Sequence, residues 1–427
     1  MSEAQKTGLM LAAPSSGSGK TLITLALLRA LSNQGVSISP AKAGPDYIDP
    51  GFHGLACRSP SINLDPWAMG EERLRLLTLG QPGNNILIEA MMGLYDGAAD
   101  GSGSAAQLAK TLSVPIVLVV DAAKQSHSIA ALVRGFRDHD PQVEIAGVIL
   151  NKVGSARHEE LLRKALRTID VPVLGAVARN AELELPERHL GLVQASETQG
   201  IEAFIDQAAE IVSGACNLNE VTAAFGKIAG PVNEELRLPP IGQRIAIAKD
   251  EAFSFIYPHV LNDWWEQGAQ IDFFSPLKDE GPAEHCDAVY LPGGYPELHA
   301  ARLSSAAQFR NRMLGLADEG TLIYGECGGY MVLGEGIIAA NGARYAMTGL
   351  LKLETSFEKR KLHLGYRKLE AEGFAFGDRL HAHEFHYTSA MKEEGPPLFT
   401  VSDALGTDLG NVGLRAGNVM GSYMHVI

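Results

Sequence analysis

The chain has 427 residues, of which 46% are hydrophobic and 20% are charged, and its formal net charge is -14 at pH 7. This length favours two or three domains, and the composition is that of a soluble globular protein. The negative charge argues against nucleic acid as a main partner, because phosphate contacts require clustered Lys and Arg. The four cysteines (Cys57, Cys216, Cys286 and Cys327) form no C-x-x-C pair, which argues against a zinc ribbon or a disulfide framework.

The first residues, MSEAQKTGLMLAAP, lack the layout of a signal peptide, and no apolar stretch is long enough to span a bilayer. Scattered cysteines fit a reducing compartment. We therefore expect a cytoplasmic protein that has no membrane partner.

Up to about Gly214, continuously apolar runs alternate with amphipathic helical patterns. The runs are GLMLAA (8 to 13), NILIEA (85 to 90), PIVLVVDA (115 to 122) and IAGVILN (145 to 151), and the helical segments include residues 21 to 35 and 158 to 169. Strands buried on both faces have such apolar runs, and the alternation of strand and helix predicts a doubly wound, mostly parallel sheet. In such a sheet, ligands bind at the carboxyl ends of the strands.

The segment APSSGSGKT (13 to 21) lies between the first of these strands and the first helix. Its second half matches the phosphate-binding pattern G-x-x-x-x-G-K-[ST], but Pro14 stands where the first glycine is expected. Phosphate would be held by the helix N-terminus, with Lys20 on the outer phosphates and the Thr21 hydroxyl on Mg²⁺. The alternative is a Gly/Ser turn with an incidental lysine. The predicted nucleotide-binding residues are Ser16, Gly17, Ser18, Gly19, Lys20 and Thr21.

Two acidic segments follow strand-like runs. KAGPDYIDPGFH (42 to 53) contains Asp46 and Asp49, and IEAMMGLYDGAADGSG (88 to 103) contains Glu89, Asp96 and Asp100. The Mg²⁺ of a nucleotide usually takes one or two protein carboxylates, and Glu89 and Asp46 are the candidates. Asp49 and Asp100 are explained equally well as solvated loop acids or turn formers. Glu89 ends an apolar run, and a carboxylate in that position needs a partner.

The strand–helix pattern weakens over residues 216 to 242, where AGPVNEELRLPPIG carries three prolines. We interpret this stretch as a linker between an N-terminal domain (1–215) and a C-terminal domain (243–427). Strand-like runs resume at RIAIAKD (244 to 250) and continue in HCDAVYLPGGYPE, GTLIYGECGGYMVLG, YAMTGLLKLETSF and LFTVSDAL.

YGECGGY (324 to 330) places Cys327 between glycines, after a strand and before a helical run, as in a nucleophile elbow that has cysteine in the serine position. A nearby histidine and the helix N-terminus would activate the thiolate. The backbone N–H groups of Gly294 and Tyr295, in YLPGGYPE (290 to 297), would form an oxyanion hole. The alternative is a buried structural cysteine.

Two segments offer the histidine that this chemistry needs. HAHEFHY (381 to 387) has three histidines, and GSYMHVI (421 to 427) has His425. The residues by themselves do not choose between the two segments.

The segments APSSGSGKT, KAGPDYIDPGFH, EAMMGLYDGAADGSG, ILNKVGS and LPERHLGLVQASE resemble the synthetase half of the cobyrinate/hydrogenobyrinate a,c-diamide synthase family. These glutamine-dependent enzymes amidate corrins during cobalamin biosynthesis. The resemblance covers nearly the whole chain, and its motifs stand in family order. It implies an α/β fold, in which a P-loop, dethiobiotin-synthetase-like doubly wound parallel sheet is followed by a class I glutamine amidotransferase-like α/β domain. The phosphate loop is then a working variant whose first glycine aligns with Ala13.

The resemblance also implies roles for individual residues. His425, in G-S-Y-x-H, would raise the nucleophilicity of Cys327, and Ile427 stands where the usual triad has a glutamate, so a Cys–His dyad is implied. The H-E-F-H segment matches the family too, but packing and substrate contact are both open for it, and a metal site is the less favoured interpretation. Substrate binding and phosphoryl transfer are assigned to Lys42, Asp46, Tyr47, Asp49 and Asp96, and the metal to Thr21, Asp46 and Glu89.

The implied reaction joins two chemistries. Glutamine would release ammonia through a Cys327 thioester, and ATP would phosphorylate a substrate carboxylate. Ammonia, passed internally between the sites, would then attack the resulting acyl phosphate. The segment EAMMGLYDGAADGSG and the length favour hydrogenobyrinate, amidated at carboxylates a and c, over cobyrinate. The alternatives are cobyrinate a,c-diamide synthase, cobyric acid synthase, and a P-loop ATPase switch with an inactive amidotransferase-like domain. The resemblance does not decide which carboxylate is amidated first, which path the ammonia takes, or whether the chain forms a homodimer.

Overall fold

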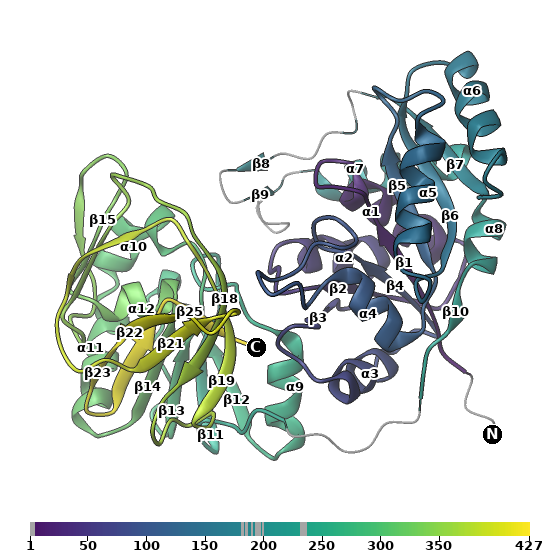
Figure 1. Ribbon diagram of the computed structural model, residues 1–427. Coiled ribbons are helices and arrows are strands. Elements are labelled where there is room, and N and C mark those ends of the chain that lie inside the picture. Colours follow the sequence, from purple (N-terminus) through teal and green to yellow (C-terminus); the bar gives the residue numbers. More distant parts are fainter. Residues whose placement is uncertain are drawn as a thin grey trace. The chain divides into compact units, whose positions relative to one another are not determined.

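The computed structural model describes residues 5–180, 183, 187–188, 191–192, 198, 200–230 and 237–427. The chain divides into two units, Met1–Glu235 and Leu236–Ile427, which are described separately below (Figure 1). Most of LPERHLGLVQASE and residues 231–236 of the predicted linker lie outside the described residues. No helix in the described ranges is long and apolar enough to cross a membrane.

The first unit is built on a parallel sheet of seven strands in the order β3-β2-β4-β1-β5-β6-β7, and β10 pairs antiparallel with β1. The strands are β1 (Thr7–Ala12), β2 (Ile38–Ala43), β3 (Ile62–Leu64), β4 (Asn85–Glu89), β5 (Ile116–Asp121), β6 (Ile145–Val153), β7 (Val173–Ala178) and β10 (Gly226–Lys227), with a separate pair β8 (Glu187–Arg188) and β9 (Gly191–Leu192). The helices are α1 (Lys20–Asn33), α2 (Asp49–Cys57), α3 (Glu71–Leu79), α4 (Ala105–Leu112), α5 (Ile129–His139), α6 (Ala156–Arg167), α7 (Ile201–Ala215) and α8 (Leu218–Ala223).

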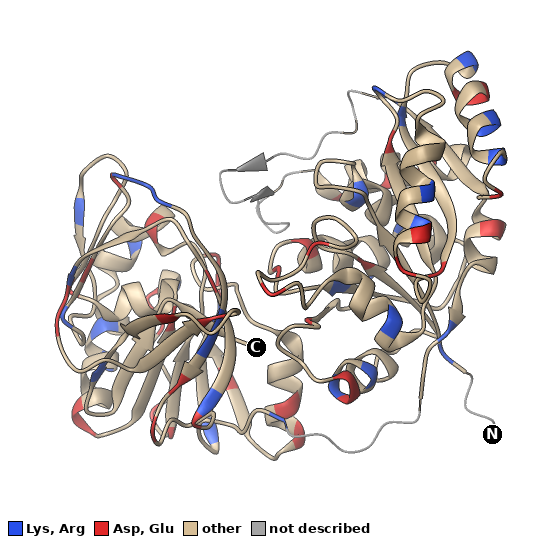
Figure 2. Cartoon of the chain, viewed as in Figure 1, with Lys and Arg blue, Asp and Glu red and all other residues tan. Residues whose placement is uncertain are grey.

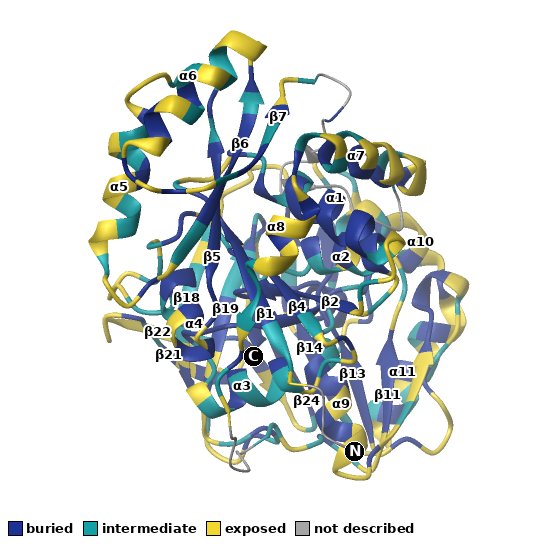
Figure 3. Ribbon diagram, turned by 90° about the vertical axis from the view of Figure 1, so that its right-hand side faces the viewer, coloured by how far each residue is buried: buried dark blue, intermediate teal, exposed yellow. Residues whose placement is uncertain are grey.

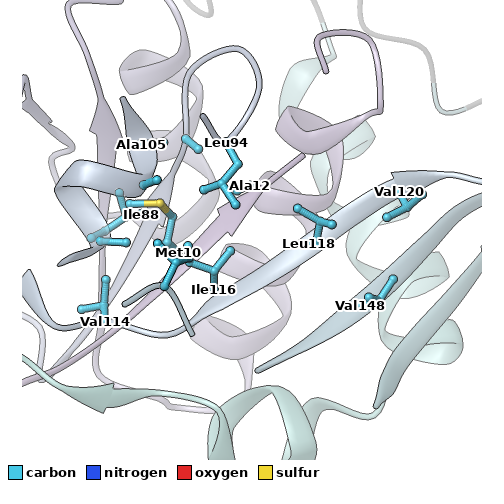
Figure 4. Close-up of a cluster of buried hydrophobic side chains, with 14 of the residues drawn as sticks. Met10, Ala12, Ile88, Leu94, Ala105, Val114, Ile116, Leu118, Val120 and Val148 are labelled. Atoms are coloured by element: carbon cyan, nitrogen blue, oxygen red, sulfur yellow. The ribbon is translucent and has the colours of Figure 1, made fainter. Parts of the chain in front are cut away.

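Alternate residues of β1 supply the two hydrophobic layers of this unit. Met10 and Ala12 belong to the cluster that also holds buried residues of α3 to α6, part of which Figure 4 shows. Leu9 and Leu11 belong to the cluster formed with α1, α2, α7 and α8. Because both faces of the sheet are covered, its central strands are continuously apolar. Figure 3 shows these strands as buried, whereas α5 and α6 expose their outer sides.

The outer surface of α6 carries both signs of charge (Figure 2), including the Arg163–Glu159 pair at 2.7 Å one helical turn apart. Such exposed pairs add only a few tenths of a kcal/mol, about 0.3–0.5, to helix stability. This helix is therefore held mainly by its buried side chains Leu162, Ala165 and Leu166.

Part of the predicted linker belongs to the first unit. Helix α8 packs its buried Leu218 and Val221 into the α1–α7 layer, and Lys227 in β10 pairs with Thr7. Ile228 lies in the opposite hydrophobic cluster. The absence of helical periodicity over 216 to 242 reflects the brevity of these elements, since one short helix and two strand residues leave no repeating pattern.

The second unit contains a six-stranded sheet in the order β12-β11-β13-β14-β24-β23, which is parallel except for β23. It also contains a mixed sheet, β16-β15-β17-β20, in which only β15 and β17 are parallel, and an antiparallel sheet, β22-β21-β18-β19-β25. Its strands are β11 (Arg244–Ala248), β12 (Gln270–Phe274), β13 (Ala288–Leu291), β14 (Leu322–Glu326), β15 (Gly336–Ile338), β16 (Arg344–Ala346), β17 (Leu353–Ser356), β18 (His363–Glu370), β19 (Arg379–His386), β20 (Ser389–Glu393), β21 (Phe399–Asp403), β22 (Asp408–Val412), β23 (Leu414–Ala416), β24 (Val419–Ser422) and β25 (Met424–Val426). The helices are α9 (Pro258–Glu266), α10 (Ala300–Ser305), α11 (Ala307–Asp318) and α12 (Gly328–Leu333), with short 3₁₀ turns η2 (Pro276–Lys278) and η3 (Pro296–Leu298). The predicted α/β class is confirmed for both units.

Candidate active sites

The predicted phosphate loop joins β1 to α1 in the first unit. Asn151 Nδ2 donates to the Ser18 carbonyl at 2.9 Å, and Lys152 Nζ donates to the Gly17 carbonyl at 3.0 Å. In a trans peptide the next N–H points away from the carbonyl, so the N–H groups of Ser18 and Gly19 face the opposite side, where a phosphate can be held. Gly19 has φ 84°, and a Cβ there would lie 2.1 Å from Asn151 Nδ2, so glycine is required.

The residues predicted to hold the metal come together beside this loop. Thr21 Oγ1 donates to Glu89 Oε1 at 2.7 Å, and Lys20 Nζ donates to the Met92 carbonyl at 2.9 Å. Asp46 lies in the loop after β2, with its Oδ2 3.9 Å from Lys42 Nζ. A hydroxyl and carboxylates that converge at the carboxyl ends of neighbouring strands are a donor set that fits Mg²⁺.

Glu89 is the centre of a buried charge network. Its side chain is 0% exposed, and it contacts Lys42 Nζ at 3.0 Å and His53 Nε2 at 2.6 Å. Burial by itself raises the pKa of Glu89, but Lys42 and His53 outweigh it and hold that pKa well below its usual range. Burial by itself lowers the pKa of Lys42. The surrounding carboxylates raise it by more, so the pKa lies above its ordinary value. Both side chains therefore stay ionised at neutral pH.

The other predicted substrate residues lie on loops around this network. Asp49 contacts Lys42, and burial and the neighbouring Asp46 raise its pKa to about 7. Asp96 is exposed, and its Oδ2 accepts from the Gly93 N–H at 2.9 Å, which shapes the loop after β4. Tyr47 is partly buried next to Asp46. Asp100 accepts from Ser102 within its own loop, so it acts as a turn former there.

Cys327 occupies a strained turn between β14 and α12. Its backbone has φ 45° and ψ -103°, a conformation that costs a non-glycine residue of the order of 1–3 kcal/mol. Gly329 makes the turn possible, because a Cβ there would lie 1.9 Å from the Leu291 carbonyl. This is the strand–turn–helix context of a nucleophile elbow.

The parallel pairing of β14 with β24 brings the C-terminal segment to this turn. The Cys327 N–H donates to the Ser422 carbonyl at 2.8 Å, three residues before His425. Glycines mark how closely these segments approach one another. A Cβ added to Gly293 would lie 2.5 Å from His425 Cε1, and a Cβ added to Gly328, the residue after the cysteine, would lie 3.0 Å from the Gly294 nitrogen. Cys327, His425 and the predicted oxyanion-hole residue Gly294 therefore gather in one place, and buried Tyr295 packs beside them on Phe255, at 5.1 Å.

Burial makes the thiol and the imidazole neutral at rest. Burial, then Glu297, raise the pKa of Cys327 above its ordinary value, and burial, then His383, lower the pKa of His425 well below its ordinary value. The sequence predicted a thiolate activated by a nearby histidine and by the helix N-terminus. Helix α12 has only 6 residues, and desolvation is the largest influence on the pKa of the thiol. A neutral imidazole can accept the thiol proton as the sulfur attacks.

Several residues around both sites carried no assigned role in the sequence. His53 and the Asn151–Lys152 pair lie within quoted motifs, but only the fold shows what they contact. Glu326, the residue before the nucleophile, accepts from Tyr290 at 2.8 Å, from Tyr324 at 3.0 Å and from the Val426 N–H at 3.3 Å. His383 stacks on His425 at 4.7 Å, and its position opposite His425 in the β19–β25 pair explains this contact.

Residues 9–193 match the CobQ/CobB/MinD/ParA nucleotide binding domain family, and residues 244–427 match the CobB/CobQ-like glutamine amidotransferase domain family. A hydrogenobyrinate a,c-diamide synthase of a Sinorhizobium species is 55% identical over 428 residues, covering 99% of this chain and 98% of that protein. The protein of that name from Rhizobium meliloti is 55% identical, covering 98% and 99%. The one from Rhodobacter capsulatus is 46% identical and covers 100% of both chains. This chain belongs to the hydrogenobyrinate a,c-diamide synthase family.

Proposed function

We propose that this chain uses ATP and glutamine to amidate the a and c carboxylates of hydrogenobyrinate. The single observation that supports this most is the full-length identity of 46% to 55% with proteins of that name, which extends through both matched domains. We assign ATP-dependent activation to the first unit, in which α8 and β10 extend the predicted synthetase domain (1–215), and ammonia release to the second unit, which contains the predicted glutaminase domain (243–427).

In the synthetase domain, the loop N–H groups and Lys20 would bind the phosphates of ATP. Thr21, Glu89 and Asp46 would hold Mg²⁺, which offsets phosphate charge when it is bound. Lys42 stays ionised beside Glu89 and would bind the acyl phosphate that forms on the substrate, with Asp46, Tyr47, Asp49 and Asp96 around it. Such positioning and charge compensation are the main contributions a protein makes to phosphoryl transfer.

In the glutaminase domain, the Cys327 sulfur would attack the side-chain carbonyl carbon of glutamine while its proton passes to His425. The N–H groups of Gly294 and Tyr295 would stabilise the oxyanion. When the tetrahedral intermediate collapses, the C–N bond breaks and His425 returns the proton to the departing ammonia. Water then cleaves the thioester to glutamate, with His425 again as the base.

Mass spectrometry of the corrin product tests the proposal. The full chain is incubated with ATP, Mg²⁺ and glutamine, and with hydrogenobyrinate or cobyrinate in parallel. We expect two amides on hydrogenobyrinate. Conversion of cobyrinate alone would identify the cobalt-containing substrate, and four amides added to an a,c-diamide would identify cobyric acid synthase. No amide on any corrin, together with no glutamine hydrolysis, would favour the ATPase-switch alternative.

We also propose a cytoplasmic location, supported by the four buried cysteines, all of which are free thiols. Fractionation of cells that express the tagged chain would test this. Light scattering of the purified chain would decide between a monomer and a homodimer.

A further inference from the structure

Three metal-binding side chains converge on one face of the β18–β19 pair. The nitrogens of His363 and His386 and a carboxylate oxygen of Glu384 all lie within 4.8 Å of one another. His386 Nε2 is 3.0 Å from Glu384 Oε1, and His363 Nδ1 is 3.9 Å from the same oxygen. Two imidazoles and a carboxylate around one point are the donor set of a three-ligand zinc site.

The strand register produces this arrangement. His363 pairs with His386 across the two strands, and Glu384 stands two residues earlier on β19, so all three side chains lie on the same face. The two rings stack at 4.6 Å with an interplanar angle of 7°. Gly365 stands opposite Glu384, and a Cβ there would lie 2.5 Å from Arg367 NH1, so glycine leaves room for Arg367 to reach Glu384.

The contacts behind these side chains orient them as ligands. Arg367 donates to Glu384 Oε2 at 2.9 and 2.7 Å, so the other oxygen, Oε1, faces the histidines. His386 Nδ1 donates to the Thr388 carbonyl at 3.2 Å, which leaves Nε2 as the nitrogen that faces Glu384. A histidine ligand that donates its other N–H to a carbonyl, and a carboxylate ligand that accepts a hydrogen bond, are recurrent partners of bound metals.

We propose that His363, Glu384 and His386 bind one transition-metal dication of the zinc class, at a site separate from that of Mg²⁺. Two nitrogen donors favour zinc and its neighbours over Mg²⁺, which takes oxygen ligands. The His363 side chain is 32% exposed, so the metal enters from solvent and a water completes its coordination.

The strand that carries two of these ligands also contacts the thiol of the second unit through its backbone. Phe385 stands between Glu384 and His386, and its carbonyl is 4.0 Å from Cys327 Sγ. A metal bound at these ligands fixes this stretch of β19 against the elbow. Because the dyad itself offers a thiol and an imidazole to a soft metal, the experiment has to separate the two places.

Cobalt titration of the full chain distinguishes metal binding at His363, Glu384 and His386 from binding at the Cys327–His425 dyad. The metal-free protein, in excess Mg²⁺, is titrated with Co²⁺ and then with Zn²⁺ as competitor. We expect one Co²⁺ per chain with visible d–d absorption, full displacement by Zn²⁺, and no thiolate charge-transfer band. His363→Ala and Glu384→Gln should each weaken binding by at least about 100-fold, beyond the 10- to 100-fold typical of outer contacts. His381→Ala is the matched control, an exposed histidine on the other face of β19, and should bind as the unmodified chain does.

Three results would overturn the proposal. They are the absence of stoichiometric Co²⁺ binding, unchanged binding by His363→Ala, and loss of binding in Cys327→Ser. The last would place the metal on the dyad. Glutaminase activity of metal-free His363→Ala, which should equal that of the unmodified chain, shows that this variant is folded.

Discussion

Lys42 in the first unit and His425 in the second are both buried, yet their pKa values move in opposite directions. Three carboxylates around Lys42 outweigh its burial and keep the ammonium charged. Around His425 no carboxylate is among the causes of the shift, and burial, His383 and His386 all favour the neutral ring. The network around Lys42 therefore compensates its buried charges, whereas burial keeps the imidazole of His425 uncharged.

This difference matches the chemistry proposed for each unit. Phosphoryl transfer needs fixed positive charge opposite the phosphates throughout the reaction, so a lysine held ionised by carboxylates is suitable. Thiol attack needs a proton to move at the moment of bond formation, so a neutral thiol beside a neutral base is suitable. Variants that damage one kind of environment should leave the chemistry of the other intact.

Cys327→Ser should have the largest effect. Glutamine-driven amidation should fall by at least about 10⁴-fold, because a hydroxyl is a far weaker nucleophile than a thiolate. Ammonium salt at alkaline pH should still support amidation, since the first unit is unchanged. Product analysis with each nitrogen source makes the measurement. A folded variant that failed with ammonia as well would contradict a separate glutaminase site.

Lys20→Ala should lower the rate of amidation by about 10³-fold with either nitrogen source, because the phosphates lose the cation expected to face them. Ammonia-driven product formation is the decisive readout. Lys110→Ala, which removes a lysine paired with Asp140 at 2.7 Å on the surface, is the matched control and should retain full activity. Equal rates for the two variants would mean that the loop does not bind the reacting nucleotide.

His425→Ala should lower glutamine hydrolysis by roughly 100-fold, the scale of lost general-base assistance. His383→Ala should lower it by less than about 10-fold, because His383 stacks on the base but transfers no proton in this mechanism. Steady-state glutaminase assays compare the two. The opposite ranking would assign the base to the segment 381 to 387.

Glu326→Gln should have the smallest effect on activity and a clear effect on the pH dependence of stability. Burial raises the pKa of Glu326 to about 7 from 4.5, so the folded chain holds a proton that the unfolded chain releases in this range. Stability contributed by this carboxyl is complete below pH 4.5 and is lost as pH rises through 7, by up to about 3 kcal/mol. Urea unfolding followed by Trp264 and Trp265 should show this loss in the unmodified chain alone. Parallel pH profiles for both chains would refute it.

The fold was largely predictable because parallel buried strands leave a strong signature. Runs such as PIVLVVDA are apolar on both faces, and the structure has β5 within that segment. Short strands with polar residues were not recognised in the sequence. β2 has the sequence ISPAKA, whose Ser39 and Lys42 are polar although buried, so the run does not stand out.

The sequence indicated candidate site residues where a motif itself implies the local geometry, as at Gly19, Lys20 and Cys327. It did not indicate the residues that contact them, because those residues come from distant parts of the chain. Glu326 contacts the N–H of Val426, 100 residues further on, and Lys152 reaches Gly17 from 135 residues away. The sequence also gave no measure of burial, and burial raises the pKa of the Cys327 thiol above its ordinary value.

The pairing of β10 with β1 determines where the first unit can be cut for separate expression. A fragment ending at residue 215 would lack α8 and β10, leaving the hydrophobic positions around Val221 and Ile228 unfilled and the start of β1 without its antiparallel neighbour. A fragment ending near residue 230 keeps them. The choice of boundary thus determines whether the activity of a separately expressed first unit reflects its catalysis or the loss of part of its hydrophobic core.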